Sequence, residues 1–385
     1  MEQKVNKKHT KPNHLTTIAV HGGTFPDEKD RDISQPIHLS TTFERNKDGS
    51  IPPFNYTRAN NPNRESVENK ISAIEGSAAA IAFASGLAAI NALLENTLKP
   101  GSHLIIPDDC YHGTRSLIET FLKRWDVQFS EVDMTGIANV EAAIQPQTNL
   151  ILIETPSNPQ LKITNIREIV SLAKKHGITT ACDNTFATPL LQKPLEMGID
   201  YVMYSSTKFF SGHSDILGGV LTTNLEDETS SRIREYQKTA GAVPSPFDCW
   251  LLNRSLSTLP LRFPVQCANA AALAVFLDKH PNVEKVFYPG LPTHVNHAIA
   301  KQQMQNGFGS IVSILVKGGQ QQALQFAGKL SLFKHATSLG GVESLVEHRR
   351  SAEGNHPLSP ENLIRISVGI EHIDDLMEDM KQALG

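Results

Sequence analysis

The sequence has no excess of basic residues, few cysteines and no long hydrophobic run. Lys and Arg number 36 against 40 Asp and Glu, a net charge of −4, so no basic face for nucleic acid is expected. No stretch approaches the roughly eighteen apolar residues of a membrane span. The cysteines lack metal or redox spacing, which favours a reduced, cytoplasmic compartment. They are Cys110, Cys182, Cys249 and Cys267.

The amino terminus also lacks the features of a targeting signal. Residues 1–14 are basic and polar, without the apolar core of a signal peptide, and we expect a disordered tail. The chain up to about residue 57 looks extended and irregular and is predicted to be an arm. No internal repeat or low-complexity segment is found. With 385 residues, of which 39% are hydrophobic, the chain is long enough for two or more domains.

Strand and helix patterns alternate from about residue 78 to 223. Short, almost continuous apolar runs, such as 103–109 and 149–155, alternate with segments of helical spacing, such as 112–125 and 165–177. This alternation predicts a mostly parallel sheet with helices on both faces. The predicted fold class is therefore α/β.

A second, smaller unit of α+β type is predicted towards the carboxyl terminus. Glycine and proline cluster in TAGAVPSPFD, residues 239–248, and a long helix pattern with breaks follows. The elements expected beyond it are strands over 283–290, 309–319 and 362–370 and helices over 321–330 and 374–384. The predicted organisation is an N-terminal arm over 1–57, an α/β domain over 58–244 and an α+β domain over 245–385.

Polar residues follow the predicted strands where each strand ends. Ligands of open parallel sheets bind outside the carboxyl ends of the strands, so we expect these residues to converge on one edge. They are Ser85 and Gly86, Asp108 and Asp109, residues 154–158, Asp183 and Asn184, and Ser205 and Thr207, with Lys208 directly after.

Some of these residues suit a phosphate. Ser85, Gly86 and Leu87 open a predicted helix, and helix N-termini bind anions, although a plain serine cap is the more common role. Ser205 and Thr207 offer two further hydroxyls, which alone would more often be strand-end caps. The pattern GxxxxGK[ST] is absent, so the phosphate is expected to belong to something other than ATP.

A lysine and an aspartate at the same edge indicate the chemistry. Lys208 could form a Schiff base. Asp183 ends an apolar strand and needs a cationic partner there, because burying an unpaired charge is costly. An amine, an acid for a protonated ring nitrogen and donors for one phosphate together match the needs of pyridoxal phosphate (PLP). A structural salt bridge from Asp183 to Lys208 or to an arginine is the alternative.

At these residues the sequence resembles the Cys/Met-metabolism family of PLP enzymes, the cystathionine synthases and lyases. The likeness covers nearly the whole chain after residue 15. It rests on seven ordered motifs: YTRANNPNRESVE, FASGLAAI, ETPSNPQL, DNTFATPLLQKPLEMGID, SSTKFFSGHSD, SLGGVESL and LIRISVGIE. The resemblance implies PLP fold type I, with an aminotransferase-like large domain and a smaller C-terminal domain. It also implies a homotetramer, built as a dimer of dimers, with active sites shared across the subunit interface and a small-molecule amino-acid substrate.

The resemblance implies roles for individual residues as well. Lys208 would carry PLP and act in catalysis with Tyr111, which would stack on the cofactor ring. Asp183 would pair with the pyridine nitrogen. The other cofactor positions would be Ser85, Gly86, Leu87, Thr185, Ser205, Thr207 and, from a neighbouring subunit, Tyr56 and Arg58. The substrate positions would be Asn55, Asn158, Thr337, Ser338 and Arg365.

Arg365 can also be interpreted without the resemblance. The segment LIRISVGI alternates like a strand and places a charge among apolar neighbours. A buried arginine needs a carboxylate, which could belong to the substrate or to a structural ion pair.

Positions around the far end of the substrate favour one reaction within the family. Relatives with γ-chemistry often carry acidic residues where this chain has Asn55 and Thr337, and some synthases have arginine where it has Ala59. A methionine γ-lyase would usually have cysteine at Gly113. The predicted activity is therefore that of a carbon–sulfur lyase of cystathionine β-lyase type, giving homocysteine, pyruvate and ammonia. The alternatives are a cystathionine γ-lyase or γ-synthase.

Other classes fit the sequence less well. An aminotransferase shares the fold and the lysine but not the seven motifs. A non-enzymatic relative would be expected to have lost Lys208 or Asp183, and both are present. His294 and His297, in THVNH, have no nearby carboxylate, so no metal site is predicted.

Overall fold

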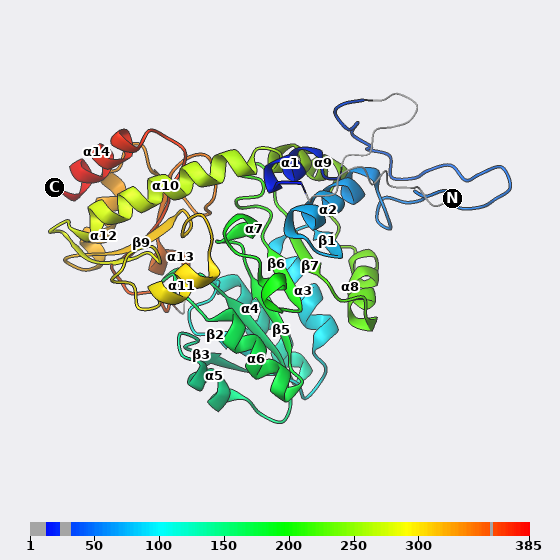
Figure 1. The fold of residues 1–385 in the computed structure, drawn as a ribbon, viewed down its shortest axis with the longest axis horizontal. Helices are drawn as coiled ribbons and strands as arrows, with labels where there is room; N and C mark the ends of the chain where they lie inside the picture. Colours follow the sequence, from blue (N-terminus) through cyan, green and yellow to red (C-terminus); the bar gives the residue numbers. More distant parts are fainter. Residues whose placement is uncertain (1–12, 24–31, 355–356) are drawn as a thin grey trace.

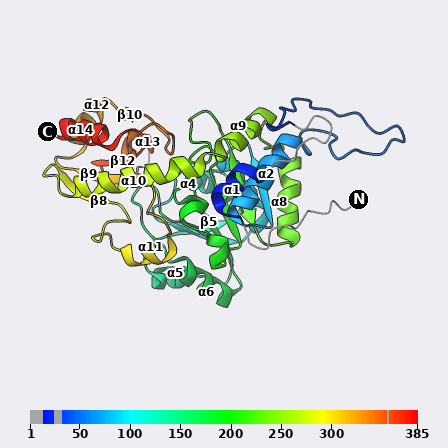
Figure 2. The ribbon, with the colours of Figure 1, turned by 45° about the horizontal axis from the view of Figure 1, so that its top comes forward.

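The computed structural model describes residues 13–23, 32–354 and 357–385. The tail predicted to be disordered lies outside the described residues, except for Asn13 and His14. The molecule has two units, each built around one β-sheet. The long helix α10 (Leu259–Asp278) runs from one unit to the other (Figure 1). The smaller sheet lies at one end of the molecule and the N-terminal arm at the other (Figure 2).

The larger sheet has seven strands in the order β1-β7-β6-β5-β4-β2-β3. They are β1 (Ala79–Phe83), β2 (His103–Pro107), β3 (Gln128–Val132), β4 (Thr148–Glu154), β5 (Thr179–Asp183), β6 (Tyr201–Tyr204) and β7 (Gly219–Thr223). The pairs among β2 to β6 are parallel, and β7 is antiparallel to both of its neighbours. The mostly parallel sheet predicted from the sequence is confirmed.

Helices cover both faces of this sheet. Those on one face are α3 (Gly86–Thr97), α4 (His112–Thr120) and α8 (Glu228–Thr239), and those on the other are α2 (Pro62–Glu75), α5 (Ile137–Ala143), α6 (Ile166–His176) and α7 (Thr188–Leu191). Short 3₁₀ turns lie at η1 (Leu122–Trp125) and η2 (Pro194–Met197). Successive strand residues enter opposite cores: Leu104 packs on the α3 face and Ile105 on the α6 face. Burial on both sides explains the continuous apolar runs.

The smaller sheet has the order β10-β11-β12-β9-β8. Its strands are β8 (Val283–Phe287), β9 (Ile311–Val316), β10 (Lys334–His335), β11 (Leu345–His348) and β12 (Leu363–Ser367). The remaining helices are α9 (Pro246–Leu256), α11 (His297–Gln303), α12 (Gln320–Lys329), α13 (Arg349–Ala352) and α14 (Ile373–Leu384). The expected α+β unit is present, and the long helix with breaks is α9 followed by α10. The domain limits at 57 and 244 remain predictions.

Several elements differ from the sequence expectation. The segment expected to be an irregular arm contains a short helix, α1 (Leu15–His21), which buries Ala19. Helix α2, helix α8 and strand β7 were not predicted. Val67, Ile71 and Ile74 of α2 are buried at helical spacing, but the buried positions also include Arg64, Glu68 and Lys70, which interrupt the apolar pattern.

Helix α10 is, within the described ranges, the single helix long and apolar enough to cross a membrane by length and composition. Half of that window is buried in the protein, and core helices commonly pass the same test. Arg262 of this helix is buried and donates to the carbonyls of Phe210 and Ser255. The helix is thus weak evidence for a membrane span.

Candidate active site

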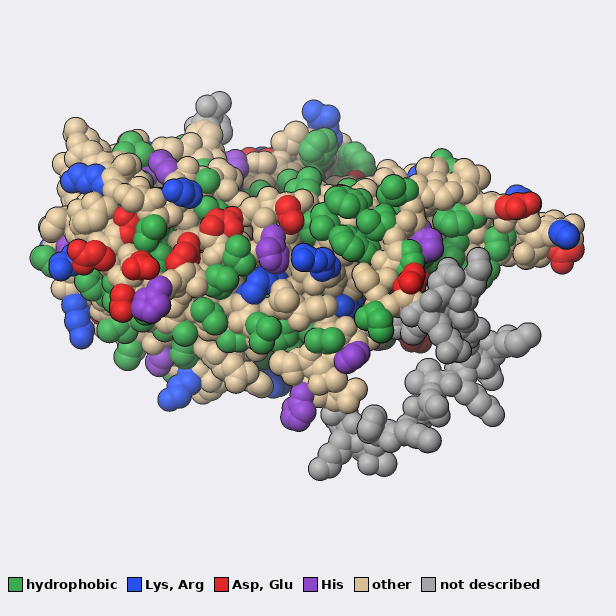
Figure 3. Space-filling model, turned by 90° about the horizontal axis from the view of Figure 1, so that it is seen from above, with side chains coloured by type: hydrophobic (Ala, Val, Ile, Leu, Met, Phe, Trp, Pro, Cys, Tyr) green, Lys and Arg blue, Asp and Glu red, His purple; other side chains and the backbone are tan. Residues whose placement is uncertain are grey.

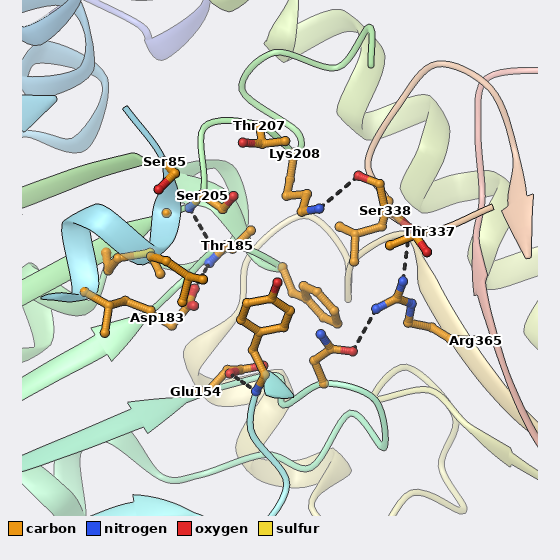
Figure 4. A pocket seen from close by; sticks show the side chains of 18 of the residues that line it. Ser85, Glu154, Asp183, Thr185, Ser205, Thr207, Lys208, Thr337, Ser338 and Arg365 are labelled. Atoms are coloured by element: carbon orange, nitrogen blue, oxygen red, sulfur yellow. Dashed lines mark hydrogen bonds between the residues drawn. The ribbon is translucent and has the colours of Figure 1, made fainter. Parts of the chain in front are cut away.

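A cavity of about 390 Å³ lies at the carboxyl ends of β4, β5 and β6, where the two units meet (Figure 4). The predicted site residues that line it are Ser85, Gly86, Leu87, Tyr111, Asn158, Asp183, Thr185, Ser205, Thr207, Lys208, Thr337, Ser338 and Arg365. The structure therefore brings most of the predicted set together. Residues that line it without having been predicted as site residues include Glu154, Phe186, Leu217 and Arg349.

Some of the strand-end residues have structural partners instead. Asp108 forms an ion pair with Lys162 at 2.7 Å. Asp109 accepts hydrogen bonds from the Ser157 hydroxyl and the Gln160 amide. The side-chain amide of Asn184 donates to the backbone carbonyl of Gln192 behind the cavity wall. These three side chains hold the loops after the strands in place.

One end of the cavity is the N-terminus of α3. Ser85 caps this helix, its Oγ accepting from the Ala88 amide at 3.1 Å, and it also lines the cavity. The amides of Gly86 and Leu87 have no acceptor within the helix, which makes this end suited to an anion. A Cβ at Gly86 would lie 3.1 Å from Ser205 Oγ, so the bare glycine allows this close approach. The serine cap that the sequence left as the alternative is present, and it leaves the Gly86 and Leu87 amides without an acceptor in the helix.

The loop after β6 carries Lys208 past this helix end. Thr207 Oγ1 accepts from the Gly218 amide at 2.9 Å and lies 3.2 Å from the Gly218 carbonyl oxygen. The amide of Ser205 donates to Thr185 Oγ1 at 2.9 Å. These bonds fix the loop on both sides of Lys208.

Two carboxyl groups lie side by side beneath the cavity. Glu154 and Asp183 are register partners in the parallel strands β4 and β5. Burial raises the pKa of Asp183, although hydrogen bonds from Thr185 oppose it. Burial, and next the charge of Asp183, raise the pKa of Glu154 well above its usual value. A cation bound in the cavity next to these two buried carboxyl groups would stabilise their ionised forms.

The structural salt bridge considered for Asp183 is absent from the described part of the chain. Lys208 instead directs its Nζ to Ser338 Oγ, at 2.9 Å (Figure 4). Burial, and next the charge of Arg365, lower the pKa of Lys208 to about 8. A large share of neutral, nucleophilic amine is therefore present at mildly alkaline pH. Ser338 has φ 101°, a value that is strained for a residue with a side chain and recurs at functional sites.

Tyr111 stands at the side of the cavity, at the start of α4. Its amide donates to Glu154 Oε2 at 2.8 Å, and the residue remains 41% exposed. A Cβ at Gly113 would lie 2.5 Å from Cε1 of this ring. The lack of a side chain at Gly113 therefore permits the observed ring position, which a cysteine there would disturb.

The far wall comes from the smaller unit and centres on Arg365. Its Nη1 donates to Asn158 Oδ1 at 2.9 Å, and its Nη2 donates to the Ser338 carbonyl at 3.0 Å and to Glu347 Oε2 at 2.6 Å. The sequence left a structural or a substrate carboxylate open as its partner. In the structure the carboxylate that pairs with Arg365 belongs to Glu347 of the protein, and Arg365 also lines the cavity. Burial would raise the pKa of Glu347, but Arg365 and Arg349 outweigh it and lower that pKa.

The remaining predicted residues, Asn55, Tyr56 and Arg58, lie outside this cavity, at the end of the arm. Arg58 Nη1 donates to the Lys238 carbonyl at 2.7 Å, and its guanidinium lies 5.6 Å from the Tyr56 ring centre. The carbonyl of Asn55 accepts from Phe43. Their supply to the site of a neighbouring subunit stays a prediction.

The histidines and cysteines have ordinary surroundings. A ring nitrogen of His294 lies 3.1 Å from the Leu161 carbonyl oxygen, and one of His297 lies 2.8 Å from that of Pro289. No group of three His, Cys, Asp or Glu that could hold a metal occurs among the described residues. All four cysteines are free and buried.

Known proteins resemble this chain over nearly its whole length. Residues 16–385 match the model of a family described as "Cys/Met metabolism PLP-dependent enzyme". Cystathionine gamma-synthase of Mycobacterium tuberculosis is 45% identical over 375 residues, 96% of each chain. Cystathionine gamma-lyase of Dictyostelium discoideum is 42% identical over 97% of this chain and 99% of its own length. Cystathionine beta-lyase of Coxiella burnetii is 39% identical over 98% and 99%.

Two solved structures also resemble this chain over nearly its whole length. The crystal structure of metB from Corynebacterium glutamicum superposes with a TM-score of 0.94 at 40% identity, covering 97% of this chain and 98% of that one. The structure of cystathionine gamma-lyase from Lactobacillus plantarum, complexed with L-serine, superposes with a TM-score of 0.90 at 38% identity, covering 96% and 98%. The reactions named for these relatives differ, although the shared length is almost complete in each.

Proposed function

We propose, from the premise that this chain belongs to the Cys/Met-metabolism family of PLP-dependent enzymes, that it acts on the carbon–sulfur bond of an amino acid of cystathionine type. The observation that carries the proposal is one cavity that joins four groups. These are a helix end suited to an anion, a buried acid pair, a lysine of lowered pKa and a buried arginine. No one of these groups would be specific alone.

The residues present fit PLP, the cofactor of the family. The helix end at Gly86, with the Ser205 hydroxyl close to it, suits a phosphate, and a side chain at position 86 would crowd Ser205. The Asp183 carboxylate would pair with the protonated ring nitrogen of PLP, and the Lys208 amine would react with its aldehyde. When bound, PLP supplies a sink for the electrons released at the substrate Cα.

The chain itself binds the substrate and moves its protons. Arg365 and Asn158 are positioned to hold the α-carboxylate, since a guanidinium binds a carboxylate with charge-assisted hydrogen bonds. As a neutral amine, Lys208 can take the proton from Cα, with Ser338 Oγ holding its Nζ nearby. The Tyr111 ring bounds the same space and limits access of water.

Within this chemistry, we propose β-elimination as in a cystathionine β-lyase. Support comes from Asn55 and Thr337, where a carboxylate for the far amino group of the substrate is lacking. The second candidate is γ-chemistry, as in a cystathionine γ-synthase or γ-lyase. It is favoured by relatives of those names at 45% and 42% identity. Lys208 could serve either reaction, because a γ-reaction needs only a second proton removal, at Cβ.

The products formed from L-cystathionine separate these candidates. The holoenzyme is expected to release homocysteine, pyruvate and ammonia, measured by chromatography of thiols and 2-oxo acids. Cysteine with 2-oxobutyrate would instead identify a γ-lyase. If homocysteine does not form, and cysteine with an activated ester of homoserine gives cystathionine, the protein is a γ-synthase. Lys208→Ala, purified in the same way, is the control for contaminating activity.

We also propose that the enzyme is a homotetramer whose active sites are shared between subunits. The arginines that line the cavity, Arg349 and Arg365, come from the smaller unit, and among the described residues no arginine of the larger unit lines it beside the helix end for the phosphate. A second copy could supply Arg58 with Tyr56. The arm exposes Ile33, at 99%, and Figure 3 shows apolar side chains gathered over the face formed by α1, α9 and α10. The four free cysteines support a cytoplasmic location.

Attachment of PLP to the apoenzyme should depend on pH with a midpoint near 8. The pKa of Lys208 is lowered to about 8, so the neutral amine rises from about a tenth of the total at pH 7 to about nine-tenths at pH 9. The attachment rate, followed by visible absorbance, should rise about tenfold over that range and then level off. A lysine of ordinary pKa would give a rate still rising steeply above pH 9, which would contradict the assignment.

A further inference from the structure

Arg349 is a buried cation with few partners. It follows β11 directly and lines the same cavity as Lys208 and Arg365. Its side chain is 6% exposed. Nη1 donates to Glu347 Oε2 at 2.5 Å, and Nη2 lies 3.8 Å from Glu353 Oε1, beyond hydrogen-bonding distance. Nε is buried and has no hydrogen-bond partner within the described residues.

A structural arginine of this protein looks different. Arg262, 7% exposed, donates from all three of its nitrogens, and its acceptors are Thr258 Oγ1 and the carbonyls of Phe209, Phe210 and Ser255. A buried donor without an acceptor costs free energy, so the under-used guanidinium of Arg349 needs an explanation. An anion in the cavity would provide one.

The carboxylates near Arg349 already have partners, except that Glu347 Oε1 is buried without a hydrogen-bond partner among the described residues. Glu353 accepts from the amides of Leu358 and Ser359 and from the Ser359 hydroxyl. Glu347 Oε2 is shared between Arg349 and Arg365, at 2.5 Å and 2.6 Å. One carboxylate therefore faces two guanidiniums, with Lys208 close by. If the α-carboxylate of a substrate binds Arg365, Glu347 balances the charge of Arg349, and the Nε of Arg349 is the donor still without an acceptor.

We propose that Arg349 binds a second carboxylate, carried on the side chain of the substrate, and so selects amino acids with two acidic ends. This rests on the proposed function of the same cavity. Two sources have the required chemistry. One is the far carboxylate of cystathionine, and the other is the free carboxylate of a homoserine ester with a dicarboxylic acid. Arg349 is thus a specificity residue rather than part of the proton transfer.

Two amino acids that differ by one carboxylate test this. L-2-aminoadipate and L-norleucine have the same six-carbon chain, and only the first has a terminal carboxylate. Titration of the holoenzyme, followed by the visible absorbance of the bound cofactor, gives a Kd for each. The wild type should prefer aminoadipate. Arg349→Gln should lose about 10-fold to 100-fold of that preference, with the Kd for norleucine changed by less than about twofold, since the loss is of a charged hydrogen bond.

Two further variants keep the test interpretable. Arg350→Gln removes the neighbouring arginine, which is exposed and donates to the Ser359 carbonyl, and it should behave as the wild type. Arg349→Lys retains the charge and should keep part of the preference even if Arg349→Gln folds poorly. Equal weakening of both ligands in Arg349→Gln would show that Arg349 acts only by positioning Glu347 against Arg365. That result, or no preference in the wild type, would overturn the proposal.

A kinetic comparison distinguishes the two sources of the carboxylate. Arg349→Gln should lower kcat/KM for cystathionine relative to cysteine, or for the succinyl ester of homoserine relative to the acetyl ester. The pair that responds identifies the source, and a response in neither pair would contradict the inference. A protein that prefers aminoadipate but forms no products from sulfur amino acids would refute the proposed function while leaving the role of Arg349 intact.

Discussion

Lys208→Ala should give a folded protein that neither holds PLP covalently nor turns over substrate. The cavity offers no second amine, because Lys208 is the one lysine among its lining residues. The variant loses both the attachment of the cofactor and the base for Cα, so activity should fall by at least about 10³-fold. The direct measurement is mass spectrometry after borohydride reduction, which fixes PLP to Lys208 in the wild type and should find no attached cofactor in the variant.

Lys70→Met is the matched control for this experiment. Burial lowers the pKa of Lys70 to about 8, as for Lys208, but Lys70 donates to the Asn253 carbonyl and to Ser257 Oγ, outside the cavity. Loss of these bonds should reduce the stability of the protein, while the absorbance and activity per folded molecule stay near those of the wild type. Covalently bound cofactor in dialysed Lys208→Ala would refute the assignment of Lys208.

Asp183→Asn should leave PLP bound but reduce kcat by about 10²-fold to 10³-fold. The amide can still accept the hydrogen bond from Thr185, which is 2.9 Å long in the wild type. It carries no charge, so it cannot keep the ring nitrogen protonated, and the cofactor becomes a poorer electron sink. Removing one partner of a buried charge pair costs about 2–5 kcal/mol, which brackets the expected effect. Steady-state kinetics and the visible spectrum of the variant measure it.

Glu154→Gln tests whether the right carboxyl group has been chosen. Burial and Asp183 raise the pKa of Glu154 well above its usual value, so at neutral pH this group is the better candidate to carry a proton. A glutamine keeps an acceptor for the Tyr111 amide, which donates to Glu154 at 2.8 Å. The variant should therefore lose less than about tenfold in kcat. If Glu154→Gln were the more damaging of the two substitutions, the roles of Asp183 and Glu154 would be exchanged.

Local patterns in the sequence predicted most of the large unit. Strands buried on both faces must be apolar at every position, and such runs are visible without a structure. Their carboxyl ends then mark one edge of the sheet, which is why residues as distant as Ser85 and Lys208 were expected together. Helix α2 was not predicted, although Val67, Ile71 and Ile74 have helical spacing, because buried charged residues interrupt that pattern and their partners are set by tertiary contacts.

The far wall of the cavity was predicted only in part. Arg365 was recognisable as a charge within an apolar strand, and Asn158 and Ser338 followed from the resemblance. Glu347 and Arg349 gave no such signal, because the pattern of residues 347–350, EHRR, is typical of a charged surface segment. The structure shows instead that Glu347 and Arg349 are buried and that β11 pairs antiparallel with β12, bringing Glu347 opposite Arg365.

The sequence by itself thus determined the α/β class, the family and the residues that suit PLP, because these depend on periodicity and on motifs contiguous in the chain. Only the tertiary structure decided which charges share the cavity. It placed Arg349 on the wall of the cavity that holds Lys208 and Arg365, left Asp183 without an ion-pair partner in the described chain and placed Tyr56 and Arg58 outside this cavity. Such pairings join residues up to hundreds of positions apart, and their strength depends on burial, which no local pattern specifies.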